Sequence, residues 1–360
     1  MTPIRPALTI VAVLLAALPQ LSAEPEKVDP LAQFTRDGKW SDIFDSGAVT
    51  TYVENDKFFA GTDRHYTNGA KLSFLGDTRL NDSPPFVQTV ASVIPWLASS
   101  AKDLDYKVGA AIGQNIYTPT DIHDPTPDPD DRPYAAWLYG ALMFQAENRT
   151  DDLLRIVEIQ FGIVGPSALG RQVQNGWHDV IGAKHAEGWS HQLHNEPGLV
   201  LTWERRFRLA RFRLSESGFS GEALASGGLS AGNVDTSARA GTTLRFGWEV
   251  PSDFGPDLIR AGGGDFVAVT RSSCYLYGAA LGRAVARDIF LDGNTWQSSP
   301  SVDKRPLVAD FNVGLVVRLP WTLGGLKGLQ VTYAQDYRTK EFYGQKQRDV
   351  FGSITLSSLF

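Results

Sequence analysis

This chain contains almost no cysteine, and it has no long apolar run beyond its N-terminus. Cys274 is the only cysteine among 360 residues, so no internal disulfide framework can form. After the N-terminus, no stretch approaches the roughly 20 apolar residues that a membrane-spanning helix needs. A basic stripe is also missing, since 34 bases stand against 40 acids, so nucleic acid is not an expected partner.

The one apolar run lies at the N-terminus and predicts an export signal. Arg5 gives a short positive start, residues 7–18 are apolar, and residues 21–23 (LSA) form a small-residue cleavage site. The run is too short to span a membrane and is interrupted by Pro19, which argues against a membrane helix. We therefore predict a cleaved signal peptide over residues 1–23.

Apolar and polar residues alternate along most of the remaining chain. In residues 237–248 the even positions run from Ala238 to Trp248 and are mostly apolar, whereas the odd positions include Arg239 and Arg245. Strands of about ten residues with one apolar face and aromatic ends are typical of transmembrane β-strands. A soluble β-sandwich also alternates, so one strand alone does not decide between the two classes.

The number of such segments and the last residue favour a membrane barrel. We find twelve segments, near 48–55, 67–75, 104–117, 133–148, 152–164, 196–208, 211–227, 236–248, 272–286, 308–321, 328–338 and 349–360. An even number suits a closed barrel with both ends on one side, and lipid cannot satisfy an open sheet edge. The terminal Phe360 resembles the assembly signal of bacterial outer-membrane barrels, which implies the barrel-assembly machinery as a partner during biogenesis.

We therefore predict an all-β protein, a twelve-stranded antiparallel transmembrane β-barrel over residues 48–360 in the bacterial outer membrane. A periplasmic segment, 24–47, precedes it. The connections at 56–66, 118–132 and 165–195 then face outward, and they hold all six histidines. Short periplasmic turns are expected at 148–152 and 209–211, and a longer, partly helical periplasmic connection at 83–101.

The third outer connection is the richest in chemistry. Residues 170–181 predict a short helix, with Gln174 and His178 one turn apart on the same face. His191 and His194 have a spacing that could suit zinc, but they lack a convincing third ligand and the chain has no His-Glu-x-x-His pattern. Solvated loop side chains are the simpler interpretation of these last two.

Four stretches resemble a known family: YVENDKFFAGTDRHYTNG, IGQNIYTP, DDRPYAAWLYG and GIVGPSALGRQVQNGWHDVIGA. They are similar to the LpxR-type lipid A 3′-O-deacylases of Gram-negative outer membranes and cover most of residues 49–200. The resemblance implies a twelve-stranded barrel that hydrolyses the ester of the 3′-linked acyloxyacyl group of lipid A, the membrane anchor of lipopolysaccharide. It also implies that a histidine activates water while Ca²⁺ polarises the scissile carbonyl.

The resemblance also implies roles for individual residues. The family's catalytic histidine falls on His178, its helix glutamine on Gln174 and its active-site threonine on Thr67. The Asn-Asp pair that would bind Ca²⁺ falls on Asn55 and Asp56. The residues we expect to contact substrate are Asn68, Gln114, Asn175 and Arg64.

Two departures from the family pattern affect this interpretation. An acidic residue expected six positions after the histidine is Lys184 here, which puts the full metal shell in doubt. A basic pair of the second outer loop has no counterpart in TDIHDPTPDPDDR. The groups that hold the lipid A phosphates therefore stay open, with Arg64, Arg132 and Lys184 as candidates.

Elementary chemistry supports the same kind of site. A positioned histidine can deprotonate water, which typically contributes ~10²–10⁴ in rate. A hard cation on oxygen ligands stabilises the developing oxyanion by several kcal/mol, and Asn55, Asp56 and Thr67 carry such oxygens. Ordinary turn chemistry is the alternative for Asn55 and Asp56, because both residue types favour tight turns.

Three amides fall on the lipid-facing side of neighbouring strands. By parity, Asn55, Asn68 and Gln114 continue the apolar faces of their strands near the outer rim, and a bulge in the second strand would move Asn68. Polar groups that face hydrocarbon are costly unless they are covered. We therefore expect residues 170–181 to fold over them and form a cleft on the outer wall, which lipid A could enter sideways.

Two alternatives remain. The stretch HYTNG, residues 65–69, is similar to the His-x-Ser-Asn-Gly motif of outer-membrane phospholipases and could pair His65 with Thr67 for nucleophilic catalysis. The chain could also be a porin-like barrel without enzymatic activity. Substitution of His178 and of His65 separates the two enzymes, and single-channel conductance would favour the porin.

Overall fold

The structure is a computed structural model that describes residues 47–55, 65–78, 104–126, 128–148, 152–214, 218–255 and 269–360. The predicted signal peptide and nearly all of the periplasmic segment lie outside these residues. So do Asp56, Arg64 and the 83–101 connection, and the side chains of His65 and Thr67. No helix among the described residues is long and apolar enough to cross a membrane.

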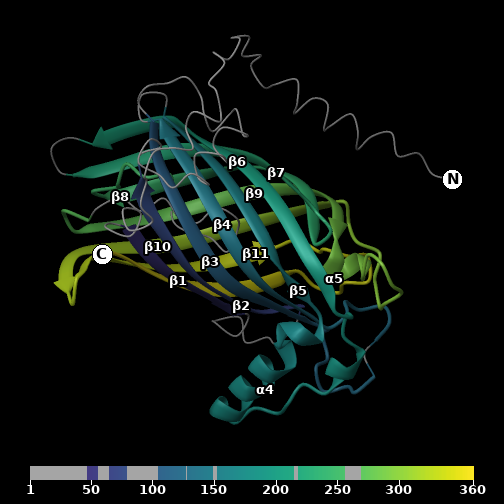
Figure 1. Cartoon of the computed structure of the whole chain (residues 1–360). Helices are drawn as coiled ribbons and strands as arrows, with labels where there is room; N and C mark the ends of the chain where they lie inside the picture. Colours follow the sequence, from purple (N-terminus) through teal and green to yellow (C-terminus); the bar gives the residue numbers. More distant parts are fainter. Residues whose placement is uncertain are drawn as a thin grey trace, which may run out of the picture.

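Twelve antiparallel strands of the described chain close into one barrel, because β1 pairs with β12 on one side and β2 on the other (Figure 1). The strands are β1 (Gly47–Asn55), β2 (His65–Thr78), β3 (Leu104–Thr118), β4 (Ala135–Asn148), β5 (Leu153–Val164), β6 (Glu196–Leu214), β7 (Phe219–Gly232), β8 (Asp235–Trp248), β9 (Ser273–Asp288), β10 (Leu307–Leu323), β11 (Leu326–Arg338) and β12 (Asp349–Leu359). The predicted fold class is confirmed.

Alternation along the strands separates an apolar outside from a polar inside. On β8 the side chains of Leu244 and Phe246 are exposed, whereas Arg245 between them is buried. Arg245 makes ion pairs with Glu222 of β7 and with Asp253 beyond the end of β8. A guanidinium group can be buried in this way because its charge is paired inside the barrel.

One predicted turn is wrong. The sequence favours a turn at residues 209–211, but β6 runs on to Leu214 and pairs with β7 on both sides of that point. The pairing register shifts between Arg208 and Ala210, which marks a β-bulge. A bulge inserts one extra residue and breaks the alternation, so in sequence it resembles the end of a strand.

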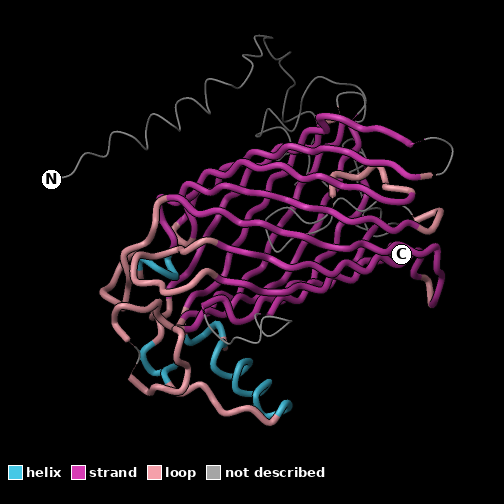
Figure 2. Tube along the Cα trace, turned by 180° about the vertical axis from the view of Figure 1, so that it is seen from behind, coloured by secondary structure: helices cyan, strands magenta, loops and turns pink. Residues whose placement is uncertain are grey.

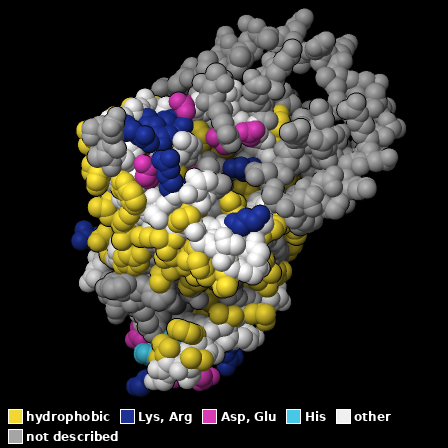
Figure 3. Space-filling view, turned by 90° about the vertical axis from the view of Figure 1, so that its left-hand side faces the viewer, with side chains coloured by type: hydrophobic (Ala, Val, Ile, Leu, Met, Phe, Trp, Pro, Cys, Tyr) yellow, Lys and Arg dark blue, Asp and Glu magenta, His cyan; other side chains and the backbone are white. Residues whose placement is uncertain are grey.

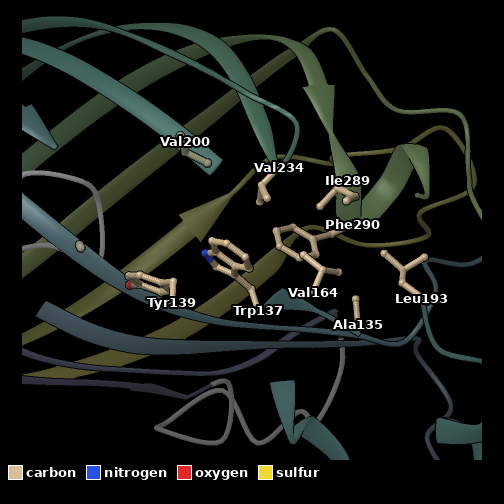
Figure 4. Close-up of a cluster of buried hydrophobic side chains, with 10 residues drawn as sticks. Ala135, Trp137, Tyr139, Val164, Leu193, Val200, Val234, Ile289 and Phe290 are labelled. Atoms are coloured by element: carbon tan, nitrogen blue, oxygen red, sulfur yellow. The ribbon is translucent and has the colours of Figure 1, made fainter. Parts of the chain in front are cut away.

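An apolar cluster lies inside the barrel near one end. Its residues point inward from β4, β5 and β6 and include Trp137, Val164 and Val200 (Figure 4). Ile289 and Phe290 join them from the short helix α5 (Ile289–Asp292). Phe290 also stacks on Tyr117 of β3, with ring centroids 4.1 Å apart. The cluster therefore lies in the barrel interior at the level of α5.

The longer connections with helices gather at this same end of the barrel (Figure 2). Both barrel termini lie at the other end, where Phe360 N–H donates to the Gly47 carbonyl at 3.0 Å. The helix α4 (Gly170–Ile181) does not cover the barrel mouth. It starts at the rim and projects away from the outside of the wall, below the strands in Figure 1. The outer wall therefore carries the candidate site.

Candidate active site on the outer wall

The helix α4 forms where the sequence predicts it and buries one narrow face. A 3₁₀ turn, η2 (Pro166–Ala168), precedes it, and Leu169 with φ 63° turns the chain into the helix. Gly182 ends it with φ 69°. Gly170, Gln174 and His178 are its buried residues, spaced four apart and therefore aligned along one side of the helix.

The start of α4 is docked on the barrel wall. Gln114 of β3 donates from Nε2 to the carbonyl of Ala168 at 2.6 Å. A Cβ on Gly170 would lie 2.5 Å from the Trp189 ring and 2.6 Å from the Ala136 Cβ of β4. Ile116 packs in the same outer cluster as Trp189 and Ala168. Gln114 is thus covered, although its partner is Ala168 of η2 and not a residue of the predicted segment 170–181.

His178 is buried to 2 % exposure on the same face of α4 as Gly170 and Gln174. Its Nδ1 lies 2.6 Å from the carbonyl oxygen of Lys184 in the returning loop. Because a carbonyl only accepts, Nδ1 carries the proton, and the neutral ring then keeps its lone pair on Nε2. A histidine oriented through Nδ1 in this way presents Nε2 as the basic nitrogen.

Gln174 lies one turn before His178 and is 4 % exposed. Its Oε1 accepts from Trp189 Nε1 at 2.8 Å, which fixes the orientation of the amide. Its Nε2 is buried and has no hydrogen-bond partner among the described residues. A buried donor without a partner is costly, so a site for an acceptor next to Gln174 has a physical reason to exist.

The two strand tips that carry the predicted metal ligands meet in register. Asn55, the last residue of β1, stands opposite Asn68 of β2, and Asn68 stands opposite Ile116 of β3. The bulge occurs between Tyr66 and Asn68, at Thr67, so Asn68 keeps its outward parity. Facing pairs lie about 5 Å apart, which places Asn68 beside the cluster that holds Trp189 and Ala168.

The donor set at these tips fits a hard cation only in part. The Oδ1 atom of Asn68 is buried without a partner among the described residues, and amide oxygens are suitable ligands for Ca²⁺. The described residues contain no group of three or more His, Cys, Asp or Glu that could hold a metal. The negative charge at the tips would come from Asp56, which lies outside the described residues.

The family model described as "Outer membrane protein LpxR" matches residues 9–360. The chain belongs to the LpxR family. Its fold is also similar to "LpxR from Salmonella typhimurium", with a TM-score of 0.67 and 20 % identity over 87 % of this chain and 99 % of that chain. A β-domain of the Bordetella autotransporter BrkA matches at a TM-score of 0.39 and 10 % identity, over 88 % of this chain and 97 % of that chain. No curated protein sequence matches.

Other candidate residues from the sequence lie in structural or exposed positions. Asn175 Oδ1 accepts from Ala186 N–H at 2.9 Å and its Nδ2 donates to the Ala186 carbonyl at 3.3 Å, so it holds the returning loop to α4. His191 and His194 are both exposed. His191 contacts Ser190, and the backbone of His194 bonds to Asn294. The described residues thus give no support to a zinc site at this pair.

Arg132, a candidate for binding phosphate, turns away from the outer wall. It is 1 % exposed, pairs with Glu341 at 3.2 Å and lies over the Tyr117 ring. Burial tends to raise the pKa of the Glu341 carboxyl, but the guanidinium groups of Arg338, Arg132 and Arg283 outweigh it and lower the pKa below its usual range. Arg132 is therefore part of an ion-pair network inside the barrel, and the phosphate role does not fit it.

Trp189 and Gly170 are the structurally central residues that sequence reasoning missed. Trp189 is 2 % exposed, packs with a tilted ring against Tyr134 with centroids 4.9 Å apart, and donates to Gln174. It comes from the short turn η3 (Gly188–His191), which has no periodic pattern around it. A lone tryptophan between glycine and serine in a long polar loop was the available signal, because such a side chain needs a place to be buried.

Replacement of Gln114 by alanine is expected to loosen the docking of η2 on the wall. The change removes the bond to the Ala168 carbonyl, at about 1 kcal/mol for one net hydrogen bond. Hydrogen exchange of residues 166–181 should speed up several-fold. Ile112→Ala, two residues away on the same outward face, is the matched control. Equal exchange in both variants would contradict the role given to this bond.

Proposed function

We propose that this chain is a Ca²⁺-dependent lipid A 3′-O-deacylase that uses His178 to activate water. The observation that carries the proposal is the burial of His178 on the face of α4 that begins against the barrel wall at Gly170, with Nδ1 2.6 Å from the Lys184 carbonyl oxygen. Membership in the LpxR family supports the substrate class. The outer-leaflet lipid that meets such a wall is the anchor of lipopolysaccharide, so its ester would reach the site without crossing a pore.

The reaction needs one proton to move twice. Nε2 of His178 takes a proton from water as the oxygen attacks the ester carbonyl. The tetrahedral intermediate then collapses, the bond to the sugar 3′-oxygen breaks, and the histidine returns the proton to that oxygen. The products are an acyloxyacyl fatty acid and a free 3′-hydroxyl. Gln174 Nε2, buried without a partner among the described groups, supports a role for this amide as a donor to the substrate.

Asn55 and Asp56 would hold Ca²⁺ together with oxygen atoms of Thr67 or Asn68. When bound, the cation would act as a Lewis acid on the ester carbonyl, worth several kcal/mol. The Oδ1 atom of Asn68 is buried and has no hydrogen-bond partner among the described residues, which supports an oxygen-rich site at these tips. The Lys184 side chain is exposed, and its backbone carbonyl is what orients His178. Lysine in place of the family's acidic residue at position 184 therefore does not remove the hydrogen bond that orients His178.

A porin-like function is less consistent with the interior of the barrel. The apolar cluster around Trp137 and Phe290 occupies the lumen near the outer end, where a porin keeps a water-filled channel (Figure 4). For a phospholipase with His65 and Thr67, both side chains lie outside the described residues, so no observation favours it.

Mass spectrometry of lipid A tests the proposal. We expect cells that express the protein to lose the 3′-linked acyloxyacyl chain from lipid A, and the purified enzyme to stop the reaction when a calcium chelator is added. Restoration by Ca²⁺ and not by Mg²⁺ would identify the cation. Unaltered lipid A in cells that contain the assembled barrel would refute the deacylase. Full activity in chelator would refute the calcium requirement alone.

A further inference from the structure

The helix α4 has an exposed apolar stripe that the catalytic role does not require. Its side chains are large and apolar, yet each is at least 40 % exposed: Leu169 46 %, Val173 40 %, Trp177 51 %, Val180 75 % and Ile181 45 %. They recur three or four residues apart, so they lie along one side of the helix. Single exposed apolar residues are ordinary, but a contiguous stripe on one helix marks an interaction surface.

The stripe lies beside the catalytic face, and the polar residues lie away from both. At 100° per residue, Gly170, Gln174 and His178 occupy the sector next to the stripe. Arg171, Gln172 and Asp179 are exposed on the remaining side. The helix therefore has a face toward the wall, an apolar face and a polar face, which is the pattern of a helix that lies in a membrane interface.

The stripe continues the lipid-facing belt of the barrel. Ile112 of β3, two residues from Gln114, is 58 % exposed on the outer wall, and Phe161 of β5 is also exposed. Gln114 anchors the segment that leads into α4. In Figure 1 the helix projects from the outside of the barrel. Figure 3 views the barrel from the end where the C-terminus lies. Apolar side chains gather over the barrel and on the projection below it, where α4 lies.

We propose that this stripe of α4 inserts among the acyl chains of the outer leaflet and anchors the helix in the membrane. The proposal commits to lipid hydrocarbon because the stripe is continuous with a surface that already faces lipid. The polar face, with Arg171 and Asp179, then lies at the headgroup level. Membrane order then directly influences how firmly α4 is held.

Site-directed spin labelling in vesicles tests the insertion. Cys274→Ser removes the native thiol, and nitroxide labels are placed by Val173→Cys and Val180→Cys on the stripe. Gln172→Cys and Asp179→Cys on the same helix are the matched controls. In phosphatidylcholine vesicles, collisions with oxygen report hydrocarbon and collisions with a water-soluble nickel chelate report water. We expect the ratio of oxygen to nickel accessibility to be several-fold higher at 173 and 180 than at 172 and 179.

Two outcomes would overturn the proposal. Equal nickel accessibility at 180 and 179 would place the stripe in water. Low accessibility to both reagents at 173 and 180 would show that protein, such as a second copy, covers it. A shift in gel mobility on heating checks that each barrel has assembled, and Trp177→Cys replaces either stripe variant that fails this check. The readout does not involve catalysis and can be repeated with His178→Ala, so it succeeds or fails independently of the deacylase proposal.

Discussion

Replacement of His178 by alanine should lower the rate of 3′-deacylation by about 10²–10⁴-fold, the usual contribution of a general base. The imidazole is buried at 2 % exposure and its Nδ1 lies 2.6 Å from the Lys184 carbonyl oxygen, so the ring is held in one orientation. Release of the acyloxyacyl acid from lipid A by purified protein, followed by mass spectrometry, measures the loss.

A structural role for His178 must be separated from a chemical one. His178→Gln keeps a donor that can reach the Lys184 carbonyl but cannot accept a proton from water, so it should be as inactive as the alanine variant. His191→Ala, at an exposed position in the same loop, should keep full activity. Recovery of activity in His178→Gln would mean that the residue only holds the loop. Loss of activity in His65→Ala alone would favour the phospholipase chemistry instead.

The strands could be predicted because the membrane imposes a simple rule on them. Hydrocarbon outside and a polar lumen inside force the alternation that is visible around Arg245, and closure requires an even number in this class. The rule fails at the bulge near Ala210, where one inserted residue interrupts the pattern while the strand continues. Local irregularities of this kind depend on the partner strand, which the sequence of one strand does not contain.

The candidate site was predictable only in the part that has a local pattern. Gln174 and His178 share a helix face by spacing alone, and the outward parity of Gln114 indicates that it needs a cover. The bond from Trp189 to Gln174 joins residues 15 apart across an irregular loop. Likewise, Arg132 finds Glu341 from another outer connection. Such contacts depend on tertiary packing. The sequence alone therefore suggested Arg132 as a candidate for binding phosphate, although the structure pairs it with Glu341 inside the barrel.

Adding a single methyl group at Gly170 tests directly how close α4 lies to the barrel wall. Gly170→Ala would put its Cβ 2.6 Å from the Ala136 Cβ and 2.5 Å from the buried Trp189 ring, so α4 must move away from the wall. Overpacking of this kind typically costs 1–3 kcal/mol. A displacement of about 1 Å in a catalytic group can cost ~10²-fold in rate. We therefore expect a large fall in deacylation, together with faster hydrogen exchange in residues 170–181.

The same helix supplies the control, because a Cβ on Gly176 would meet nothing within 4 Å. Gly176→Ala should leave activity unchanged and strengthen the helix by up to about 1 kcal/mol, since alanine is the better helix former. Ala136→Gly added to Gly170→Ala removes one of the two clashes and should restore part of the activity. If Gly170→Ala behaved like Gly176→Ala, the helix would not be held at this distance from the barrel. The proposed role of α4 in catalysis would then be refuted, because the close contact of Gly170 with the wall and Trp189 would not fix the position of His178.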